Sequence, residues 1–290
     1  MRFACQVQRH PGWPRSEVYS HYRMRLRLWG VRGSVPWASA PCIGHGCNTP
    51  CVELVTEDGS RLILDAGSGL VGLTDVLTRE PAKVAVLLTH YHWDHLHGLP
   101  FFAPLYVPDS SPMIWAPAIN DLNGGWLGTM FTSPFFPVPY EALPSRPTIE
   151  RIDVGHHAIG AFRVRAIRLN HPGGAFAYRI QGTTSDVVYA TDHELGNPAI
   201  DEPLAEFVRG AGLLIFDSHF TPEESPTHRN WGHSHWAEVA TFAASASVDR
   251  LWLFHHKPGR TDIELTEIEA AARKIHPHTD AAAEGDTIEL

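Results

Sequence analysis

The sequence lacks the marks of a membrane or secreted protein. No stretch approaches the roughly 18 consecutive apolar residues that a membrane-spanning helix needs. The first residues carry Arg2, Arg9 and Arg15, and they contain no apolar segment of the kind that a secretory signal peptide requires. We therefore expect a cytoplasmic protein that has no membrane partner.

Cysteine is scarce, and its spacing is not the usual spacing of zinc ligands. The four cysteines are Cys5, Cys42, Cys47 and Cys51. A C-x-x-C pair is missing and no fourth ligand is obvious, so a structural zinc site is disfavoured. A disulfide is disfavoured too, because cytosolic proteins rarely contain one. We expect reduced thiols in a loop and a strand.

Charged residues are also few, and they are unbalanced. They make up 19% of the 290 residues, and the formal net charge is -9 with histidine neutral. Such an acidic chain is poorly suited to bind long nucleic acid or an anionic membrane. A small anionic substrate remains compatible with it, because bound metal ions can reverse the local field. Apolar residues make up 43%, which is enough for a sizeable core.

Hydrophobic runs and helical periods predict one domain over residues 25–290. Strands are predicted at 26–31, 50–56, 61–64, 84–88, 162–169, 177–180, 187–190, 213–216 and 250–254, and helices at about 70–78, 236–246 and 266–275. Residues 1–24 are polar and show no period, so we expect an arm there, and the aromatic and Pro-rich segment at about 100–150 is predicted to be an insert. We expect an α/β fold with two mixed sheets flanked by helices.

Histidine, in contrast, is plentiful, with nineteen residues. The densest cluster is His90-x-His92-x-Asp94-His95, which directly follows the predicted buried strand at 84–88. Ligands and catalytic groups gather at the carboxyl ends of such strands. Four ligand-type side chains on one turn can supply two metal ions, and leaving such a cluster unpaired beside the core would be costly. We therefore predict metal binding.

Three further ligand-type residues stand where a predicted strand ends, namely His171, Asp192 and His255, with His256 as the alternative to His255. Each is weak evidence alone, but together with the histidine motif they form a set. The seven predicted ligands are His90, His92, Asp94, His95, His171, Asp192 and His255. These donors suit two divalent ions, Zn²⁺ first, with Mn²⁺ or Fe as alternatives. A hydroxide held between ions roughly 3.5–4 Å apart is a strong nucleophile, and Asp94 can orient it. Asp192 can bridge the two ions with its two carboxylate oxygens.

These residues resemble those of the metallo-β-lactamase superfamily along nearly the whole length of the chain from Met24. The sequence is similar to the branch that contains phosphoribosyl cyclic phosphate phosphodiesterases and RNase Z enzymes. The motifs that carry the resemblance, besides the His90–His95 cluster, are Trp29-Gly30-Val31-Arg32-Gly33-Ser34, Asn48-Thr49, Leu64-Asp65-Ala66-Gly67, His171-Pro172, Thr191-Asp192, Gly232-His233-Ser234 and Phe254-His255-His256.

The resemblance implies an αβ/βα sandwich with a dinuclear site at the sheet edges. It implies one metal on His90, His92 and His171, the other on Asp94, His95 and His255, and Asp192 as the bridge. It also implies that Asp65 supports the histidine loop. Two departures from the branch are His45-Gly46-Cys47 in place of a double glycine before Asn48, and His235 in place of a serine or threonine.

His233 is the residue that favours phosphodiester hydrolysis. In the branch that this chain resembles, the matching histidine sits beside the scissile phosphate, where a cationic imidazole can protonate the departing alkoxide. Asp217 could hold it in orientation, while His219 and His228 are weaker candidates, and a plain helix-start role is the alternative. We predict hydrolysis of a small, possibly cyclic phosphodiester by a protein that can form a homodimer. The insert offers stacking surfaces or, equally, core packing at Trp115, Trp126, Phe131, Phe135 and Phe136.

Other activities of the same fold remain open at this point. An RNase, a lactamase, or a thioester or lactone hydrolase would use the same ligands. A di-iron redox protein is a further alternative, but such proteins usually carry glutamate where His92 stands. A metal-binding module without catalysis is the last, and the complete ligand set argues against it.

Overall fold

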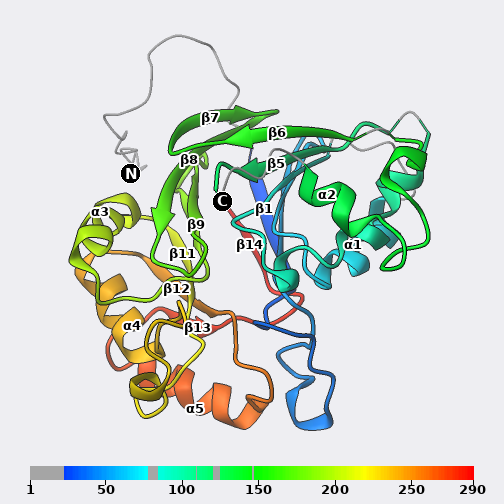
Figure 1. The fold of residues 1–290 in the computed structure, drawn as a ribbon. Coiled ribbons are helices and arrows are strands. Elements are labelled where there is room, and N and C mark those ends of the chain that lie inside the picture. The colour runs from blue at the N-terminus through cyan, green and yellow to red at the C-terminus, as the bar shows by residue number, and fades with distance from the viewer. Residues whose placement is uncertain (1–22, 78–83, 109, 120–124, 146) are drawn as a thin grey trace.

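Within the described residues, the strands form two sheets of seven strands each (Figure 1). The structure is a computed structural model, and it describes residues 23–77, 84–108, 110–119, 125–145 and 147–290. The orders are β14-β1-β2-β3-β4-β5-β6 and β13-β12-β11-β10-β9-β8-β7. Each sheet has a parallel and an antiparallel half, so the predicted pair of mixed sheets is confirmed. The predicted arm lies outside the described residues, except that Met24 already pairs in β1.

The first sheet contains most of the N-terminal half of the chain. Its strands are β1 (Met24–Gly30), β2 (Cys51–Thr56), β3 (Arg61–Leu64), β4 (Val84–Leu87), β5 (Met113–Pro117), β6 (Thr148–Ile152) and β14 (Thr287–Glu289). The strands from β14 to β3 are antiparallel, and those from β3 to β6 are parallel. The segment at 100–150, for which no element was predicted, therefore supplies two strands of this sheet.

The second sheet is built from the C-terminal half. Its strands are β7 (Gly155–Ile159), β8 (Phe162–Leu169), β9 (Ala175–Ile180), β10 (Val187–Ala190), β11 (Leu213–Asp217), β12 (Arg250–Phe254) and β13 (Thr279–Ala281). The pairs from β7 to β10 are antiparallel, and those from β10 to β13 are parallel.

Helices cover the outer faces of the two sheets, which gives four layers. They are α1 (Gly69–Leu77), α2 (Gly125–Met130), α3 (Pro198–Val208), α4 (Trp236–Ser245) and α5 (Asp262–Ala272). Helix α5 begins four residues before its predicted start, because Thr261 and Glu264 form a capping box that satisfies its first backbone N–H groups. None of the helices in the described ranges is long and apolar enough to cross a membrane.

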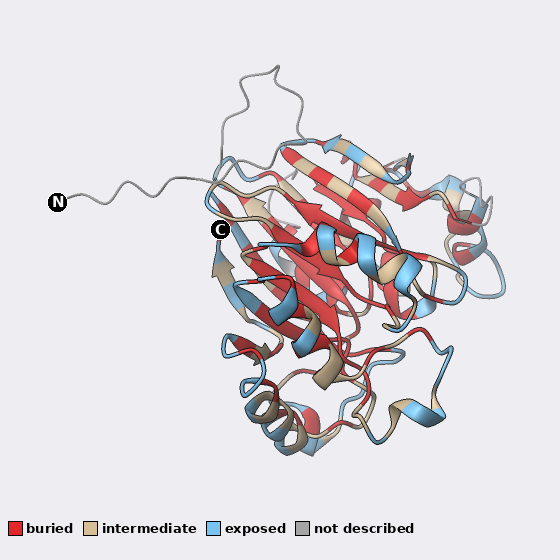
Figure 2. Ribbon diagram, turned by 90° about the vertical axis from the view of Figure 1, so that its left-hand side faces the viewer, coloured by how far each residue is buried: buried red, intermediate tan, exposed pale blue. Residues whose placement is uncertain are grey.

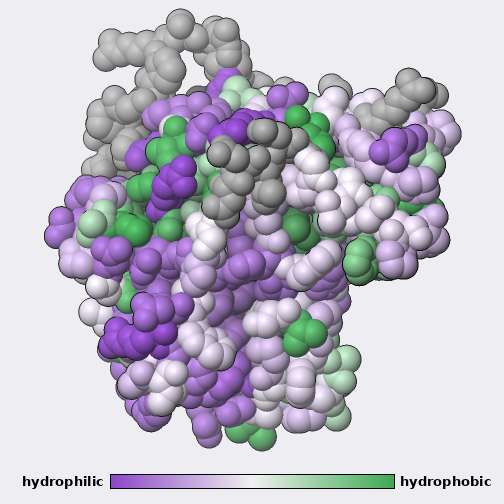
Figure 3. All heavy atoms as spheres, viewed as in Figure 1, coloured by the Kyte–Doolittle hydropathy of each residue, from purple (hydrophilic) through white to green (hydrophobic). Residues whose placement is uncertain are grey.

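The main core lies between the two sheets, and two further clusters lie under the helices (Figure 2). Strand β4 shows why its sequence is apolar throughout. Ala85 and Leu87 face the core between the sheets, whereas Val84, Val86 and Leu88 face the cluster under α1. On the face seen in Figure 3, hydrophobic residues lie in small patches among polar ones.

The aromatic residues of the insert mostly serve packing. Trp126 and Phe131 are buried in the cluster under α1 and α2, and Phe136 packs against it. Trp115 packs against the core between the sheets. Phe135, with 79% of its surface exposed, is the one of the five predicted stacking residues that stands out into solvent. The stacking interpretation was therefore wrong for Trp126 and Phe131, which cannot reach a substrate.

Candidate metal centre

The structure brings all seven predicted ligands together where strands of both sheets end. The segment from His90 to His95 follows β4 in the first sheet, while His171, Asp192 and His255 follow β8, β10 and β12 in the second. Asp192 and His255 adopt the left-handed conformation, with φ of 59° and 61°. Such a conformation is unfavourable for residues other than glycine and is often found at functional sites. Here it turns the chain sharply at a strand end.

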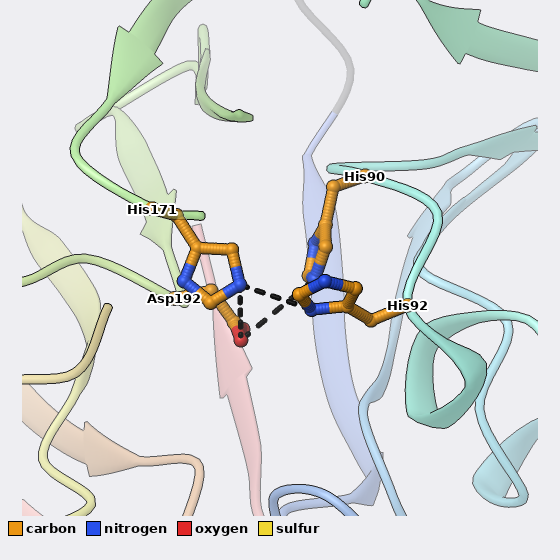
Figure 4. A group of neighbouring side chains, drawn as sticks. All are labelled: His90, His92, His171 and Asp192. Carbon is orange, nitrogen blue, oxygen red and sulfur yellow. Dashed lines mark hydrogen bonds and ion pairs between the residues drawn. The ribbon is translucent and has the colours of Figure 1, made fainter. Parts of the chain in front are cut away.

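Four of these residues form a first ligand group around one point (Figure 4). They are His90, His92, His171 and Asp192, and their ligand atoms lie within 4.8 Å of one another. His171 Nε2 lies 3.0 Å from His92 Nδ1 and 3.7 Å from Asp192 Oδ1. His90 Nε2 lies 3.8 Å from the same oxygen. Three imidazoles and one carboxylate oxygen thus converge.

A second ligand group lies on the other side of Asp192. It consists of Asp94, His95 and His255. Asp94 Oδ2 lies 3.3 Å from His95 Nε2 and 3.2 Å from His255 Nε2. Asp192 Oδ2 lies 3.2 Å from His95 Nε2 and 3.4 Å from His255 Nε2. The two oxygens of Asp192 therefore face different groups, which is the geometry of a bridging carboxylate.

The donor atoms fit divalent metal ions. Among the described residues, the buried Nε2 atoms of His90 and His95 have no hydrogen-bond partner. Their Nδ1 atoms do have partners, since His90 Nδ1 lies 3.0 Å from Thr89 Oγ1 and His95 Nδ1 lies 2.8 Å from Asp65 Oδ2. Buried nitrogens without a partner are costly unless something binds them, and an imidazole fixed at one nitrogen is the usual form of a metal ligand.

The electrostatics of the first ligand group also suit a cation. Burial lowers the pKa of His90 and of His171, which keeps both imidazoles neutral, as ligands must be. Burial opposes the ionisation of Asp192, but the neighbouring His255 and His95 outweigh it and lower the pKa of Asp192 well below its usual value. Neutral imidazoles around a buried carboxylate leave a negative centre that a cation can balance.

Asp65 holds the histidine loop in place, as the family resemblance implied. Its carboxylate accepts hydrogen bonds from Thr89 N at 2.7 Å, His95 Nδ1 at 2.8 Å and the Tyr189 hydroxyl at 2.9 Å. Tyr189 belongs to the second sheet, so this buried carboxylate also joins the two sheets. Ser34, which the sequence analysis did not single out as a site residue, has a similar role, because its backbone N–H donates to Asp94 Oδ2 at 2.7 Å.

His233 lies beside both ligand groups and is oriented by Asp217. Its Nδ1 lies 2.5 Å from Asp217 Oδ2 and 3.9 Å from Asp192 Oδ1. The His233 ring stacks on the rings of His255 and His219, with centroids 5.0 Å and 4.6 Å apart. Burial lowers the pKa of His233, but Asp217 outweighs this effect and raises it to about 9.

Several other candidates lie outside the ligand groups. His256 Nε2 is 2.8 Å from the Ala282 carbonyl, so His255 and not His256 faces the centre. His228 stacks on Phe220, and His235 caps the start of α4. The described cysteines Cys42, Cys47 and Cys51 are free thiols, and no ligand group found among the described residues includes them. Cys5 lies outside the described residues.

Two exposed tryptophans adjoin the ligand motifs in the sequence, and the sequence analysis did not single them out as site residues. Trp93 is 66% exposed and follows His92, and Trp231 is 60% exposed and precedes Gly232 and His233. Their position next to the two motifs was the signal in the sequence that could have identified them.

Comparison with known proteins gives a consistent result. A family model described as a beta-lactamase superfamily domain matches residues 60–256. A ribonuclease Z from Bradyrhizobium sp. (strain ORS 278) is 29% identical over 308 residues, which cover 91% of this chain and 98% of that protein. The metallo-beta-lactamase fold protein YhfI from Bacillus subtilis superposes with a TM-score of 0.69 at 20% identity, covering 93% of this chain and all of that one. A diphosphatase described as belonging to the PhnP family gives a TM-score of 0.67 at 18% identity, covering 92% and 97%.

Proposed function

Because this chain belongs to the beta-lactamase superfamily, we propose that it uses two divalent metal ions to hydrolyse the phosphodiester bond of a small substrate. It is a metal-dependent hydrolase. The single observation that carries the finer proposal is the pairing of His233 with Asp217 beside both ligand groups. A bond with an alkoxide leaving group needs a proton donor at that place, and phosphodiesters have such a leaving group.

The proposed ligands divide between the two ions as the distances suggest. His90, His92 and His171 would hold one ion, and Asp94, His95 and His255 the other, with one oxygen of Asp192 on each. The mixture of imidazole and carboxylate donors suits Zn²⁺. When bound, such a pair of ions supplies a water-derived nucleophile at neutral pH and offsets phosphoryl charge.

His233 and Asp217 would act on the leaving group. Since Nδ1 of His233 is taken by Asp217, its Nε2 is the nitrogen left to reach a substrate. The buried carboxylate fixes the ring orientation and favours the protonated imidazole. From this position His233 can donate a proton to the departing oxygen and, while protonated, stabilise the charge on the phosphoryl group.

The net charge and the exposed aromatic residues bear on the size of the substrate. The net charge of -9 favours a small phosphodiester, because long RNA is bound mainly through cationic side chains. Trp93 and Trp231 are exposed and adjoin the His92 and His233 motifs in the sequence, so their indoles would suit a substrate with a planar group. The second candidate is cleavage of RNA, which is favoured by the relative named ribonuclease Z that matches nearly the whole chain.

A substrate panel tests the proposal. Protein loaded with Zn²⁺ or Mn²⁺ is expected to hydrolyse bis(p-nitrophenyl) phosphate and at least one small cyclic phosphodiester, and to leave a β-lactam and a thioester intact. A precursor tRNA transcript in the same panel decides between the two candidates. Metal-loaded protein that turns over none of the phosphodiesters would refute the proposed function.

Two further expectations remain predictions. Metal analysis of the purified protein should find two equivalents of a divalent ion, with zinc as the first candidate. Light scattering coupled to size-exclusion chromatography will test the expected homodimer.

A further inference from the structure

Glu194 lies two residues after Asp192 and connects three loops of the site. Its carboxylate accepts two backbone hydrogen bonds, Oε1 from Asn230 N and Oε2 from Gly232 N, both at 2.9 Å. Asn230 and Gly232 have positive φ values of 66° and 85°. In such an irregular segment the N–H groups cannot pair within a helix or sheet, so the carboxylate supplies their acceptors.

Gly232 passes this restraint on to His171. The Gly232 carbonyl lies 3.0 Å from His171 Nδ1 and accepts a hydrogen bond from its N–H group. The approach is so close that a Cβ at position 232 would stand 2.2 Å from the same nitrogen. Because Nδ1 carries the hydrogen, the lone pair of His171 is on Nε2, the atom that faces His92 and Asp192.

The backbone of Glu194 is also hydrogen-bonded to Asn170, the residue that precedes His171. Glu194 N donates to the Asn170 carbonyl at 3.0 Å, and Asn170 Nδ2 donates to the Glu194 carbonyl at 2.8 Å. The neighbouring His193 strengthens the same link, since its Nδ1 accepts from Asn170 N at 3.0 Å. His171 is therefore held at both ends, through its own backbone neighbour and through its ring.

We propose that Glu194 is a positioning residue that orients His171 and so sets the metal affinity of the first ligand group alone. This inference rests on the ligand set in the proposed function. The second ligand group has different supports, because Asp65 holds His95 and the Ser34 backbone holds Asp94. Loss of the Glu194 carboxylate should accordingly weaken one ion and spare the other.

A metal titration of Glu194→Ala tests this inference. Zinc affinities are measured by competition with a chromophoric chelator, with thermal melting of the apo forms to check that the variant is folded. We expect the variant to bind one ion as the unmodified protein does and the other about 10–100-fold more weakly, the usual cost of losing a supporting contact. Glu194→Gln keeps an acceptor for one of the two N–H groups, so its zinc affinity at the first ligand group should lie between those of the unmodified protein and Glu194→Ala.

Glu264→Ala is the matched control. Glu264 also accepts a backbone hydrogen bond, from Thr261 N at 2.7 Å, together with bonds from Thr261 Oγ1 at 2.8 Å and Arg260 Nη1 at 3.4 Å, but it does so at the start of α5. Both zinc affinities should stay unchanged in this variant. An equal loss of zinc affinity in Glu194→Ala and Glu264→Ala would show a general structural effect and would overturn the inference.

A double-mutant cycle identifies the ion that is weakened. In a His171→Ala background, Glu194→Ala should add little, because the residue through which it acts is gone. In a His255→Ala background it should keep its full effect on the remaining ion. Unchanged affinities in Glu194→Ala, or the same effect in both backgrounds, would refute the positioning role. Failure of the unmodified protein to bind two ions would instead refute the proposed ligand set.

Discussion

At the scale of single residues, the site depends on which nitrogen of each histidine is already engaged. His90, His95 and His171 each use Nδ1 in a contact with Thr89, Asp65 or Gly232 and turn Nε2 to the centre. His92 instead presents Nδ1, which lies 3.0 Å from His171 Nε2. These contacts fix ring orientation before any ion arrives, which reduces the cost of binding it.

His233→Ala is expected to keep its metal and lose most of its rate. A positioned general acid contributes about 10²–10⁴-fold, so kcat should fall by that factor while the zinc content stays the same. The comparison is His228→Ala, because His228 lies on the same loop but stacks on Phe220 and belongs to neither ligand group. If His233→Ala loses an ion instead, His233 is a ligand and the assignment of a proton donor is wrong.

At the scale of elements, the strands place the ligands by where they end. The parallel strands β10, β11 and β12 run side by side and deliver Asp192, Asp217 and His255 to one edge. Strand β4 delivers the histidine loop from the opposite sheet. The buried side chains of β4 pack on both faces of the sheet, and this packing fixes the position of the histidine loop that follows the strand.

Leu87→Ala in β4 is expected to destabilise the fold. Leu87 is fully buried between the sheets, and a Leu→Ala change at such a site costs about 2–5 kcal/mol because it leaves a cavity. Chemical denaturation of the apo protein measures the change in the free energy of unfolding. Ile263→Ala, at a position that is 73% exposed on α5, removes a side chain of similar size and should cost far less. Equal losses in the two variants would contradict the packing described for β4.

At the scale of the whole molecule, the centre joins the two halves of the chain. The first sheet supplies four of the proposed ligands and the second sheet supplies three. Tyr189 and Asp65 link the sheets directly beneath the centre. Bound ions would thus act as cross-links between two sheets that meet mainly through apolar side chains.

Removal of metal is expected to lower the stability of the whole domain. An ion that binds only the folded state stabilises it by about 2.7 kcal/mol when it is present at 100 times its Kd. Addition of a chelator should therefore shift thermal unfolding to lower temperature, and excess zinc should reverse the shift. A melting temperature that does not respond to metal would contradict ions that join the two sheets.

The strongest elements were predictable from local sequence, and the weaker ones were not. Strands β4, β10, β11 and β12 are short and mostly apolar, β8 alternates apolar and polar residues, and the predicted ranges of these strands and of β9 agree closely with the structure. Strands β5, β6, β7, β13 and β14 were missed, because they are only three to five residues long and most of their residues are not fully buried. Helix α3 was missed as well, and Pro203 within it interrupts the usual helical signal.

The sequence by itself indicated the candidate chemistry of the site, because metal ligands must be particular residue types and these cluster after apolar strands. It indicated all seven proposed ligands, as well as Asp65 and Asp217. The family resemblance implied which ligands share an ion, but only the tertiary structure decided which nitrogen of each histidine faces the centre, since residues as distant as His92 and His171 meet through the packing of two sheets. It also decided that Glu194 supports His171, because a carboxylate that accepts two backbone N–H groups from a remote loop leaves no pattern along the chain.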